Sequence, residues 1–434
     1  MFFPEPTKQP VMETTAPAKV ETKMPLPVGQ TLAAMTRSGA GYSHRPNVRD
    51  AVRDACASAL QPLDGTPPDI VLLFSTTGYD PRAVVDEVRT HIGTSVLVGC
   101  SGEGVIARGV ADEGKRALCV MAIASRTLRF QSIASTEYGI EPVRSAETLA
   151  TQILAQGATD IRGVILFADG LQGNCNAFLR TLEARLPPGT ILCGGTAGDA
   201  MAFERTHQYH GDKAHGDTVS SGAVTGLVIR GAAKVRVETS HGCLPIGTER
   251  QITKADAGWL REIDGRRAWD VFREYLDGDP QDLNAEGIVH LCIGEPLSAG
   301  ATSDHDEFVI HTPLKLDKDT GALFFPGGGI AEGTRVRLTR RDPSQIVSSS
   351  RACVNRLLAH SRRPPAFVLQ FDCAGRGRIL FGSATRDVVV APMQAEAPET
   401  TWAGFFTYGE IAPVGGRPFY HNYTAVLCGV FDEE

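Results

Sequence analysis

Several features that would place this chain in a familiar class are missing from its sequence. The ten cysteines include no C-x-x-C pair, so zinc ribbons, iron–sulfur runs and covalent c-type haem attachment have no support. No run of eighteen apolar residues occurs, and the amino-terminal MFFPEPTKQP has no apolar run of signal-peptide length. Several cysteines lie in apolar runs, where a free thiol behaves as a small hydrophobe, and this favours a reducing compartment. We therefore expect a cytoplasmic protein without membrane insertion.

An excess of positive charge is also missing. The 434 residues contain 43 Lys and Arg against 50 Asp and Glu, a formal net charge of -7. A chain of this sign repels phosphate backbones, so we expect no nucleic-acid partner. Residues 1–30 are rich in Pro, Thr, Lys and Glu and lack a hydrophobic period, which is typical of a disordered tail.

Regular secondary structure is expected from residue 48 onward. The hydrophobic pattern predicts helices at 48–60, 81–91, 146–156, 174–186, 268–276 and 344–360. It predicts strands at 70–74, 95–99, 118–123, 128–133, 163–167, 190–193, 260–263, 289–293, 308–310, 323–325, 335–338 and 367–371. This alternation predicts an α/β, mixed α+β fold with two intimately associated mixed-sheet halves and flanking helices. We place the boundary near residue 247, between halves at 48–246 and 247–431.

Two strand pairings are expected within these halves. Residues 221–230 and 234–240 predict an antiparallel pair around Gly231. The aromatic runs 405–408 and 419–426 flank a turn-rich centre that contains Gly415 and Gly416. These runs therefore predict a hairpin with a long connection.

Two glycine-rich turns follow short apolar strands, at 99–104 and 194–199. Neither G-x-G-x-x-G nor G-x-x-x-x-G-K-[ST] fits the first turn. Exposed backbone N–H groups in such turns can hold a carboxylate or another anion, or the turn is a tight strand exit without a ligand. The candidate binding residues at these turns are Gly99, Cys100, Ser101, Gly102, Gly194, Gly195 and Thr196.

Two residues of opposite charge, Arg376 and Glu410, lie near the ends of later predicted strands. Arg376 follows Cys373 at the end of a predicted strand, and Glu410 lies at the mouth of the predicted hairpin. A guanidinium group matches a carboxylate bidentately. If the hairpin folds back toward the end of the strand at 367–371, Arg376 and Glu410 would form either a structural ion pair or the two poles of a pocket for a zwitterion. His421 and Asn422 open the terminal strand and complete the candidate set.

Metal and nucleophile chemistry have few candidates. The spacing of the histidines between residues 207 and 215 gives little support for zinc. A lone histidine on an apolar wall can be an axial haem ligand, which makes His207 and His241 candidates, although ordinary hydrogen-bonded histidines are more common. A nucleophilic Cys100 or Cys373 would need a neighbouring base or a positive field, and the sequence shows no recognisable partner.

Five segments in this order resemble the FIST family, a sensory module found mainly in signal-transduction proteins. The segments are VLVGCSGEGVI, ILCGGTAGDA, HGCLPIGTERQITKADAGWLREIDGRRAWDVF, FDCAGRG, and GFFTYGEIAP followed by FYHNYT. The resemblance covers about residues 48–431. It implies an N-terminal and a C-terminal FIST half that act as one ligand-sensing body, with amino acids among the proposed ligands. Some similar proteins bind haem and sense nitric oxide, and pass the signal to a histidine kinase or a cyclic-dinucleotide enzyme.

Three functions remain open at this point, beside a purely scaffolding role that would show neither a ligand nor turnover. The leading hypothesis is a sensor, not an enzyme, in which a small ligand such as an amino acid shifts the population of two arrangements and so regulates a separate partner. The second has haem as the ligand and nitric oxide as the signal. The third is an enzyme with Cys100 or Cys373 as its nucleophile.

Overall fold

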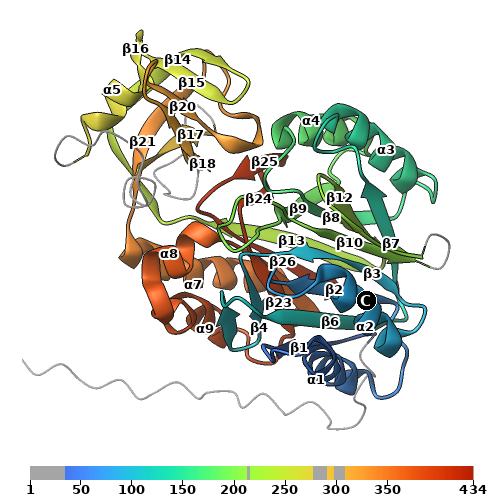
Figure 1. Cartoon of the computed structure of the whole chain (residues 1–434). Helices are drawn as coiled ribbons and strands as arrows, with labels where there is room; N and C mark the ends of the chain where they lie inside the picture. Colours follow the sequence, from blue (N-terminus) through green and yellow to red (C-terminus); the bar gives the residue numbers. More distant parts are fainter. Residues whose placement is uncertain (1–34, 213–215, 277–290, 298–307, 434) are drawn as a thin grey trace, which may run out of the picture. The chain divides into compact units, whose positions relative to one another are not determined.

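The computed structural model describes residues 35–212, 216–276, 291–297 and 308–433 (Figure 1). The expected tail at 1–30 lies outside these residues, as do the first two residues of the strand expected at 289–293. Within the described ranges the strands form four sheets that mix parallel and antiparallel pairing, with helices packed against them. The mixed fold class expected from the sequence is therefore confirmed.

Three of the sheets, here called A, B and C, have six strands each. Sheet A has the order β1 (Thr36–Ser43), β6 (Leu118–Ser125), β2 (Ile70–Ser75), β3 (Val96–Ser101), β10 (Gln208–Asp212), β11 (Gly216–Ser220). Sheet B has the order β13 (Ala233–Ser240), β26 (Ala425–Asp432), β22 (Phe367–Cys373), β23 (Trp402–Thr407), β4 (Gly104–Ala107), β5 (Val110–Asp112). Sheet C has the order β7 (Leu128–Ser135), β12 (Val224–Gly231), β8 (Ile161–Ala168), β9 (Ile191–Thr196), β24 (Gly409–Val414), β25 (Arg417–His421).

Sheet D is inserted between β13 and β22. Its strands are β14 (Cys243–Asp256), β15 (Trp259–Ile263), β16 (Arg266–Arg267), β17 (Leu291–Pro296), β18 (Phe308–His311), β19 (Lys315–Asp317), β20 (Ala322–Phe324) and β21 (Arg335–Arg341). The boundary expected near residue 247 falls inside β14, which pairs with both β21 and β15.

Sheets A, B and C repeat one plan. In each, the two central strands are parallel (β2 with β3, β22 with β23, β8 with β9), and the other neighbouring strands are antiparallel. The last two strands of each sheet are a hairpin that comes from another part of the chain. The chain therefore contains three equivalent units: β1–β6, β7–β12, and β13–β26 with sheet D inserted.

The register of the parallel pairs confirms this equivalence. Phe74 lies opposite Cys100, Phe167 opposite Gly195, and Phe371 opposite Phe405. The residue before each of these partners is a glycine, namely Gly99, Gly194 or Gly404. A Cβ atom at these three glycines would lie 1.8, 2.0 and 1.8 Å from a carbonyl oxygen of the neighbouring strand. Glycine is required here because the two backbones approach too closely for any side chain.

The equivalent phenylalanines meet in a core shared by the three sheets. The rings of Phe74 and Phe167 lie 5.5 Å apart edge to face, and those of Phe167 and Phe371 lie 6.1 Å apart. Phe405 stacks on Phe74 at 4.9 Å. Such aromatic contacts add to the free energy of burying the rings, so this cluster holds sheets A, B and C together.

Helices cover the outer faces of sheets A, B and C, and α5 (Ala268–Arg273) packs on sheet D. They are α1 (Val48–Leu60), α2 (Pro81–Ile92), α3 (Pro142–Leu154), α4 (Cys175–Arg185), α5 (Ala268–Arg273), α7 (Pro343–Ala359), α8 (Arg378–Phe381) and α9 (Ala391–Ala395), with a π-helix at Arg386–Val390 and 3₁₀ turns at Gln61–Leu63, Pro326–Gly328, Ala374–Arg376 and Gly382–Ala384. Helices α3 and α4 pack side by side on β8 and β12 (Figure 1). Side chains of Asn47 and Asp80 cap α1 and α2, where the sequence predicts helix starts. No helix within the described ranges is long and apolar enough to cross a bilayer.

Two expected pairings are wrong. Strand β12, which ends at Gly231, and strand β13 enter different sheets, because β12 takes partners on both edges, β7 and β8. The runs 405–408 and 419–426 do not form one hairpin. β23 and β26 lie on opposite sides of β22, and the turn-rich centre between them folds as the hairpin β24–β25.

Candidate functional site

The glycine-rich turns lie where the ends of β3 and β9 meet neighbouring sheets. The N–H groups of Ser101, Gly102, Glu103, Ala197 and Gly198 donate to the carbonyl oxygens of His207, Ser75, Phe406, Ala168 and Ser101. An anion in either turn would have to displace these main-chain partners. The turns therefore join the sheets, which is the strand-exit alternative, and the main chain already uses the donors that an anion nest would need.

Other side chains at these turns have the same role. Ser101 Oγ donates to Gly198 O at 2.8 Å, and Thr196 Oγ1 donates to Gly409 O at 3.2 Å. A Cβ atom on Gly195 would lie 2.5 Å from Thr407 Cγ2. These contacts link the strand ends of all three units to one another.

A cluster of two carboxyl groups and a phenol lies where the strand ends meet. It takes Glu103 from the first unit, Asp199 from the second and Tyr408 from the third. Tyr408 OH lies 2.6 Å from Asp199 Oδ1 and 3.2 Å from Glu103 Oε2. Glu103 and Asp199 are almost completely buried. Sequence reasoning missed this cluster, because its members are far apart in the chain and no local pattern connects them.

Burial acts differently on the two acids. It raises the pKa of Glu103 to about 7, despite the hydrogen bond from Met201 N. Burial also opposes ionisation of Asp199. Hydrogen bonds from Tyr408 and from the backbone of residues 203–205 outweigh it and lower the pKa of Asp199. The cluster therefore combines an ionised Asp199 with a Glu103 that titrates near neutrality.

Glu410 is buried away from solvent, and its partners are neutral. Its carboxyl group contacts the Thr407 hydroxyl and accepts a hydrogen bond of 3.1 Å from Thr424 N. Thr407 Oγ1 also lies 3.2 Å from Asp372 O, so its single proton cannot serve both acceptors. Burial raises the pKa of Glu410 to about 8. A protonated Glu410 resolves this conflict. It donates its own proton to Thr407 Oγ1, and the Thr407 proton is then free for Asp372 O.

Arg376 is paired with a different acid. It donates from Nε to Asp372 Oδ1 at 2.8 Å, from Nη1 to His241 O at 3.1 Å, and from Nη2 to Ser350 Oγ at 2.6 Å. Its side chain is completely buried. The structure therefore places Arg376 in a structural ion pair with Asp372, and Glu410 is not part of it.

The remaining predicted residues are also packed inside the protein. His421 Nε2 lies 3.3 Å from Ala412 O, and burial lowers the pKa of His421 to about 4. Asn422 Nδ2 donates to Tyr408 O at 3.3 Å, and its Oδ1 accepts from Thr312 N at 3.1 Å. Asn422 therefore connects the insertion to the third unit.

The thiol and haem candidates have different surroundings. Burial raises the pKa of both Cys100 and Cys373, which is the opposite of what an activated nucleophile needs. His207 is partly buried, and burial lowers its pKa. His241 is buried, and its Nδ1 accepts a hydrogen bond of 2.9 Å from Cys243 N.

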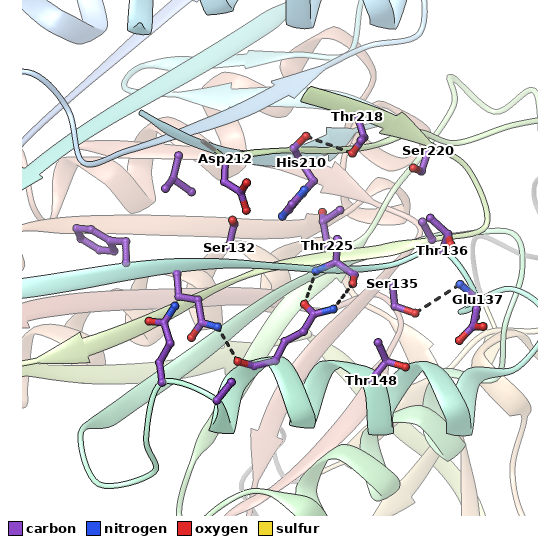
Figure 2. A pocket seen from close by; sticks show the side chains of 18 of the residues that line it. Ser132, Ser135, Thr136, Glu137, Thr148, His210, Asp212, Thr218, Ser220 and Thr225 are labelled. Atoms are coloured by element: carbon purple, nitrogen blue, oxygen red, sulfur yellow. Dashed lines mark hydrogen bonds between the residues drawn. The ribbon is translucent and has the colours of Figure 1, made fainter. Parts of the chain in front are cut away.

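A cavity of about 900 Å³ lies elsewhere, between the β10–β11 hairpin of sheet A and the β7, β12 and α3 side of sheet C (Figure 2). This volume is within the range of small-molecule sites. The lining residues labelled in Figure 2 carry hydroxyl, imidazole or carboxylate groups: Ser132, Ser135, Thr136, Glu137, Thr148, His210, Asp212, Thr218, Ser220 and Thr225. None of the binding residues expected from the sequence lines it.

Charges of both signs stand on the cavity lining. Arg144 Nε lies 3.5 Å from Glu137 Oε2, and this exposed cation also pairs with Glu141 outside the cavity. Asp212 and His210 come from the opposite wall on β10 (Figure 2). The lining can therefore donate to a carboxylate and accept from an ammonium group.

One local signal for the cavity was available in the sequence. Phe130, Ser132 and Ala134 alternate along β7 and line the cavity, and Thr218 and Ser220 do the same along β11. Alternate residues of a strand share one face, so Thr218 and Ser220 place two hydroxyl groups on one face of β11, and Ser132 adds one from β7. That these faces lie opposite each other depends on the exchange of hairpins between sheets, which the sequence pattern does not reveal.

Comparison with family models identifies the class of protein. The FIST N domain model matches residues 69–266, and the FIST C domain model matches residues 268–413. The chain therefore belongs to the FIST family, whose domains are sensory domains of signal-transduction proteins.

Similar chains occur in mycobacteria. An uncharacterised protein of Mycobacterium tuberculosis is 29% identical over 399 residues, covering 90% of this chain and 99% of the relative. An uncharacterised protein of Mycobacterium bovis is 28% identical over 412 residues, covering 92% and 99%. Among solved structures, a cyanuric acid hydrolase aligns over 91% of this chain and 100% of its own, with 11% identity and a TM-score of 0.31.

Proposed function

We propose that this chain is a cytoplasmic sensor that binds a small zwitterion such as an amino acid in the cavity between sheets A and C. The observation that supports this is the composition of the lining. It carries the exposed Arg144, which a ligand carboxylate would share with Glu137 and Glu141, and the carboxylates of Glu137 and Asp212 for an ammonium group. The hydroxyl groups between them can bind polar substituents. Ligand binding favours one arrangement of the two walls, and a separate protein such as a histidine kinase or a cyclic-dinucleotide enzyme responds to it.

This location replaces the one expected from Arg376 and Glu410. Both of those side chains are completely buried, and Arg376 is already satisfied by Asp372. A ligand would have to open the core to reach them. The cavity wall needs no such opening, because Ser132, Thr136 and Arg144 are at least partly exposed.

The haem alternative remains a separate hypothesis. Neither His207 nor His241, the axial candidates expected from the sequence, lines this cavity, and His210 is the histidine that does. An absorption spectrum of protein purified from haem-supplemented cells tests the alternative directly, because a Soret band would reveal bound haem.

A thermal-shift screen of the proteinogenic amino acids tests the proposed function. A ligand at one hundred times its Kd stabilises the native state by about 2.7 kcal/mol. The Ser132→Phe variant should lose this shift, because the ring fills part of the cavity. The matched Ser348→Phe variant should keep it, because Ser348 is exposed on α7 and does not line the cavity. Equal shifts in both variants would show that the ligand binds elsewhere.

A further inference from the structure

The loop Asp199–Arg205 has a backbone conformation that its residues disfavour. Ala200, Met201 and Phe203 have φ angles of 59°, 57° and 53°, in the left-handed region where a Cβ atom is crowded. All residues from 200 to 205 are exposed, including the apolar side chains of Met201 and Phe203. Burial of apolar surface therefore does not account for this conformation.

Carboxylates hold the loop in place. Asp199 accepts hydrogen bonds from the N–H groups of Phe203, Glu204 and Arg205 at 3.0, 2.7 and 2.8 Å. Glu103 Oε2 accepts from Met201 N at 2.7 Å. Phe203 stacks on Tyr408 with ring centroids 5.1 Å apart. A disfavoured backbone that persists through a few polar contacts has an alternative conformation within reach when those contacts weaken.

A second buried carboxylate joins the end of this loop to the cavity. Asp169 Oδ2 accepts a hydrogen bond of 2.6 Å from Thr206 Oγ1 and one of 2.9 Å from Gly222 N. Thr206 directly follows the loop. Gly222 and Ala223 lie between Ser220 and Thr225, which both line the cavity.

Gln208 makes a parallel connection. Its Nε2 donates to Thr206 Oγ1 at 3.2 Å, and its Oε1 accepts from Ala223 N at 3.2 Å. Gln208 also opens β10, which carries His210 and Asp212 into the cavity. Any molecule that pulls β10 toward β12 therefore acts on the side chains of Gln208 and Asp169, which hold Thr206 Oγ1.

We propose that occupancy of the cavity is coupled to the conformation of the loop Asp199–Arg205 through the buried carboxylate of Asp169. This inference rests on the proposed function, because it gives that cavity an output. A bound molecule braces β10 against β7 and β12, keeps Thr206 on Asp169, and holds the loop in its strained form. Without it, the network loosens and the loop opens. The loop then changes the surface that it offers to solvent without a change in the sheets.

A covalent probe tests the coupling without knowledge of the natural ligand. All ten cysteines are buried, so Ser132→Cys introduces one accessible thiol in the cavity. Benzyl methanethiosulfonate then fills the cavity. Trypsin cleavage after the exposed Arg205, followed by mass spectrometry of the intact chain, reports loop opening. We expect labelling to slow this cleavage at least threefold, and amide hydrogen exchange at residues 200–206 to slow with it.

Matched variants complete the experiment. The same label on Ser348→Cys, outside the cavity, should leave the cleavage rate unchanged. Thr206→Val in the Ser132→Cys background removes the donor to Asp169 and should abolish the effect of labelling, whereas Thr206→Ser should restore it. A change of less than threefold on labelling the Ser132→Cys variant would overturn the coupling, as would an equal change in the Thr206→Val background.

The two proposals fail in different ways. If labelling protects Arg205 but no amino acid shifts the melting temperature, the coupling stands and the proposed ligand class is wrong. If an amino acid binds and labelling has no effect on Arg205, the proposed function stands and the coupling is wrong.

Discussion

Tyr408 donates a hydrogen bond of 2.6 Å to Asp199 Oδ1, which connects the third unit of the chain to the second. The same hydroxyl group lies 3.2 Å from Glu103 Oε2 in the first unit. One phenolic proton therefore stands between two buried acids, and it can be donated to only one of them at a time. The contact to Glu103 is favourable when Glu103 carries its own proton.

Removal of this hydroxyl group should destabilise the protein. We expect Tyr408→Phe to lower the free energy of unfolding by about 1–3 kcal/mol, because a buried charged acceptor loses a partner. Urea denaturation measures the change. Tyr420→Phe is the control, since that buried hydroxyl makes contacts of only 3.5 Å. If both variants lose the same free energy, the Tyr408–Asp199 bond has no special importance.

Stability should fall as the pH rises from about 4.5 to 8. Burial raises the pKa values of Glu103, Glu113 and Glu410 to about 7, 8 and 8. In this window the native state holds protons that the unfolded state has released. Each group therefore contributes a decrease of up to about 1.4 kcal/mol per pH unit. Melting temperatures across this pH range, extrapolated to low salt, measure how steeply the stability falls with pH.

Glu410→Gln isolates one contribution to that slope. An amide can donate to Thr407 as the protonated acid does, so we expect wild-type stability near pH 5 and greater stability than wild type near pH 8. Glu399→Gln, at an exposed position, should leave the slope unchanged. A wild-type slope in Glu410→Gln would mean that Glu410 is ionised in the native protein.

The equivalence of the three units predicts matching effects at three glycines. Gly99→Ala, Gly194→Ala and Gly404→Ala should each cost about 3 kcal/mol or more, because the new methyl group meets a carbonyl oxygen of the neighbouring strand. Gly415→Ala is the control, with open space and a φ of 59°, and should cost about 1–2 kcal/mol. Soluble yield and urea midpoints give the comparison. A mild effect at Gly404 alone would argue against the equivalence.

The native thiols should be inert. Because burial raises the pKa values of Cys100 and Cys373, we expect iodoacetamide at pH 7 to modify neither before the protein unfolds. Mass spectrometry of native and urea-unfolded samples measures this. Rapid modification of a single native cysteine would instead support the enzyme hypothesis.

Local patterns were sufficient for elements whose determinants are adjacent in sequence. The helix at 48–60 is confirmed at both ends, and Pro81 begins α2 as expected. The strand at 70–74 is confirmed because its apolar run is short and bounded. The pairings of 221–230 with 234–240 and of 405–408 with 419–426 were wrong for a different reason, since partner choice depends on edges offered by remote strands. A hairpin does turn at Gly415 and Gly416, but its strands are β24 and β25.

For the candidate site residues too, the sequence indicates which positions matter but not which remote partners they contact. Gly99 and Gly194 are structurally important, but for backbone contact, which no single sequence distinguishes from anion binding. Arg376 and Glu410 were expected to meet, yet Asp372 lies much closer to Arg376 along the chain and takes its place. Ser132, His210 and Thr225 reach one cavity only because β10 pairs with β3 while β12 pairs with β7.

The exchange of hairpins between sheets also determines which fragments of this protein can keep a complete sheet. Sheet A is completed by β10–β11 from the second unit, sheet C by β24–β25 from the third, and sheet B by β4–β5 from the first. A fragment that ends after β12 would leave β9 with an unpaired edge, and a fragment that begins at β13 would do the same to β23. We therefore expect that neither fragment folds on its own. Such a closed ring of exchanges also requires contacts between distant residues before any sheet is whole, which predicts slow, all-or-none folding.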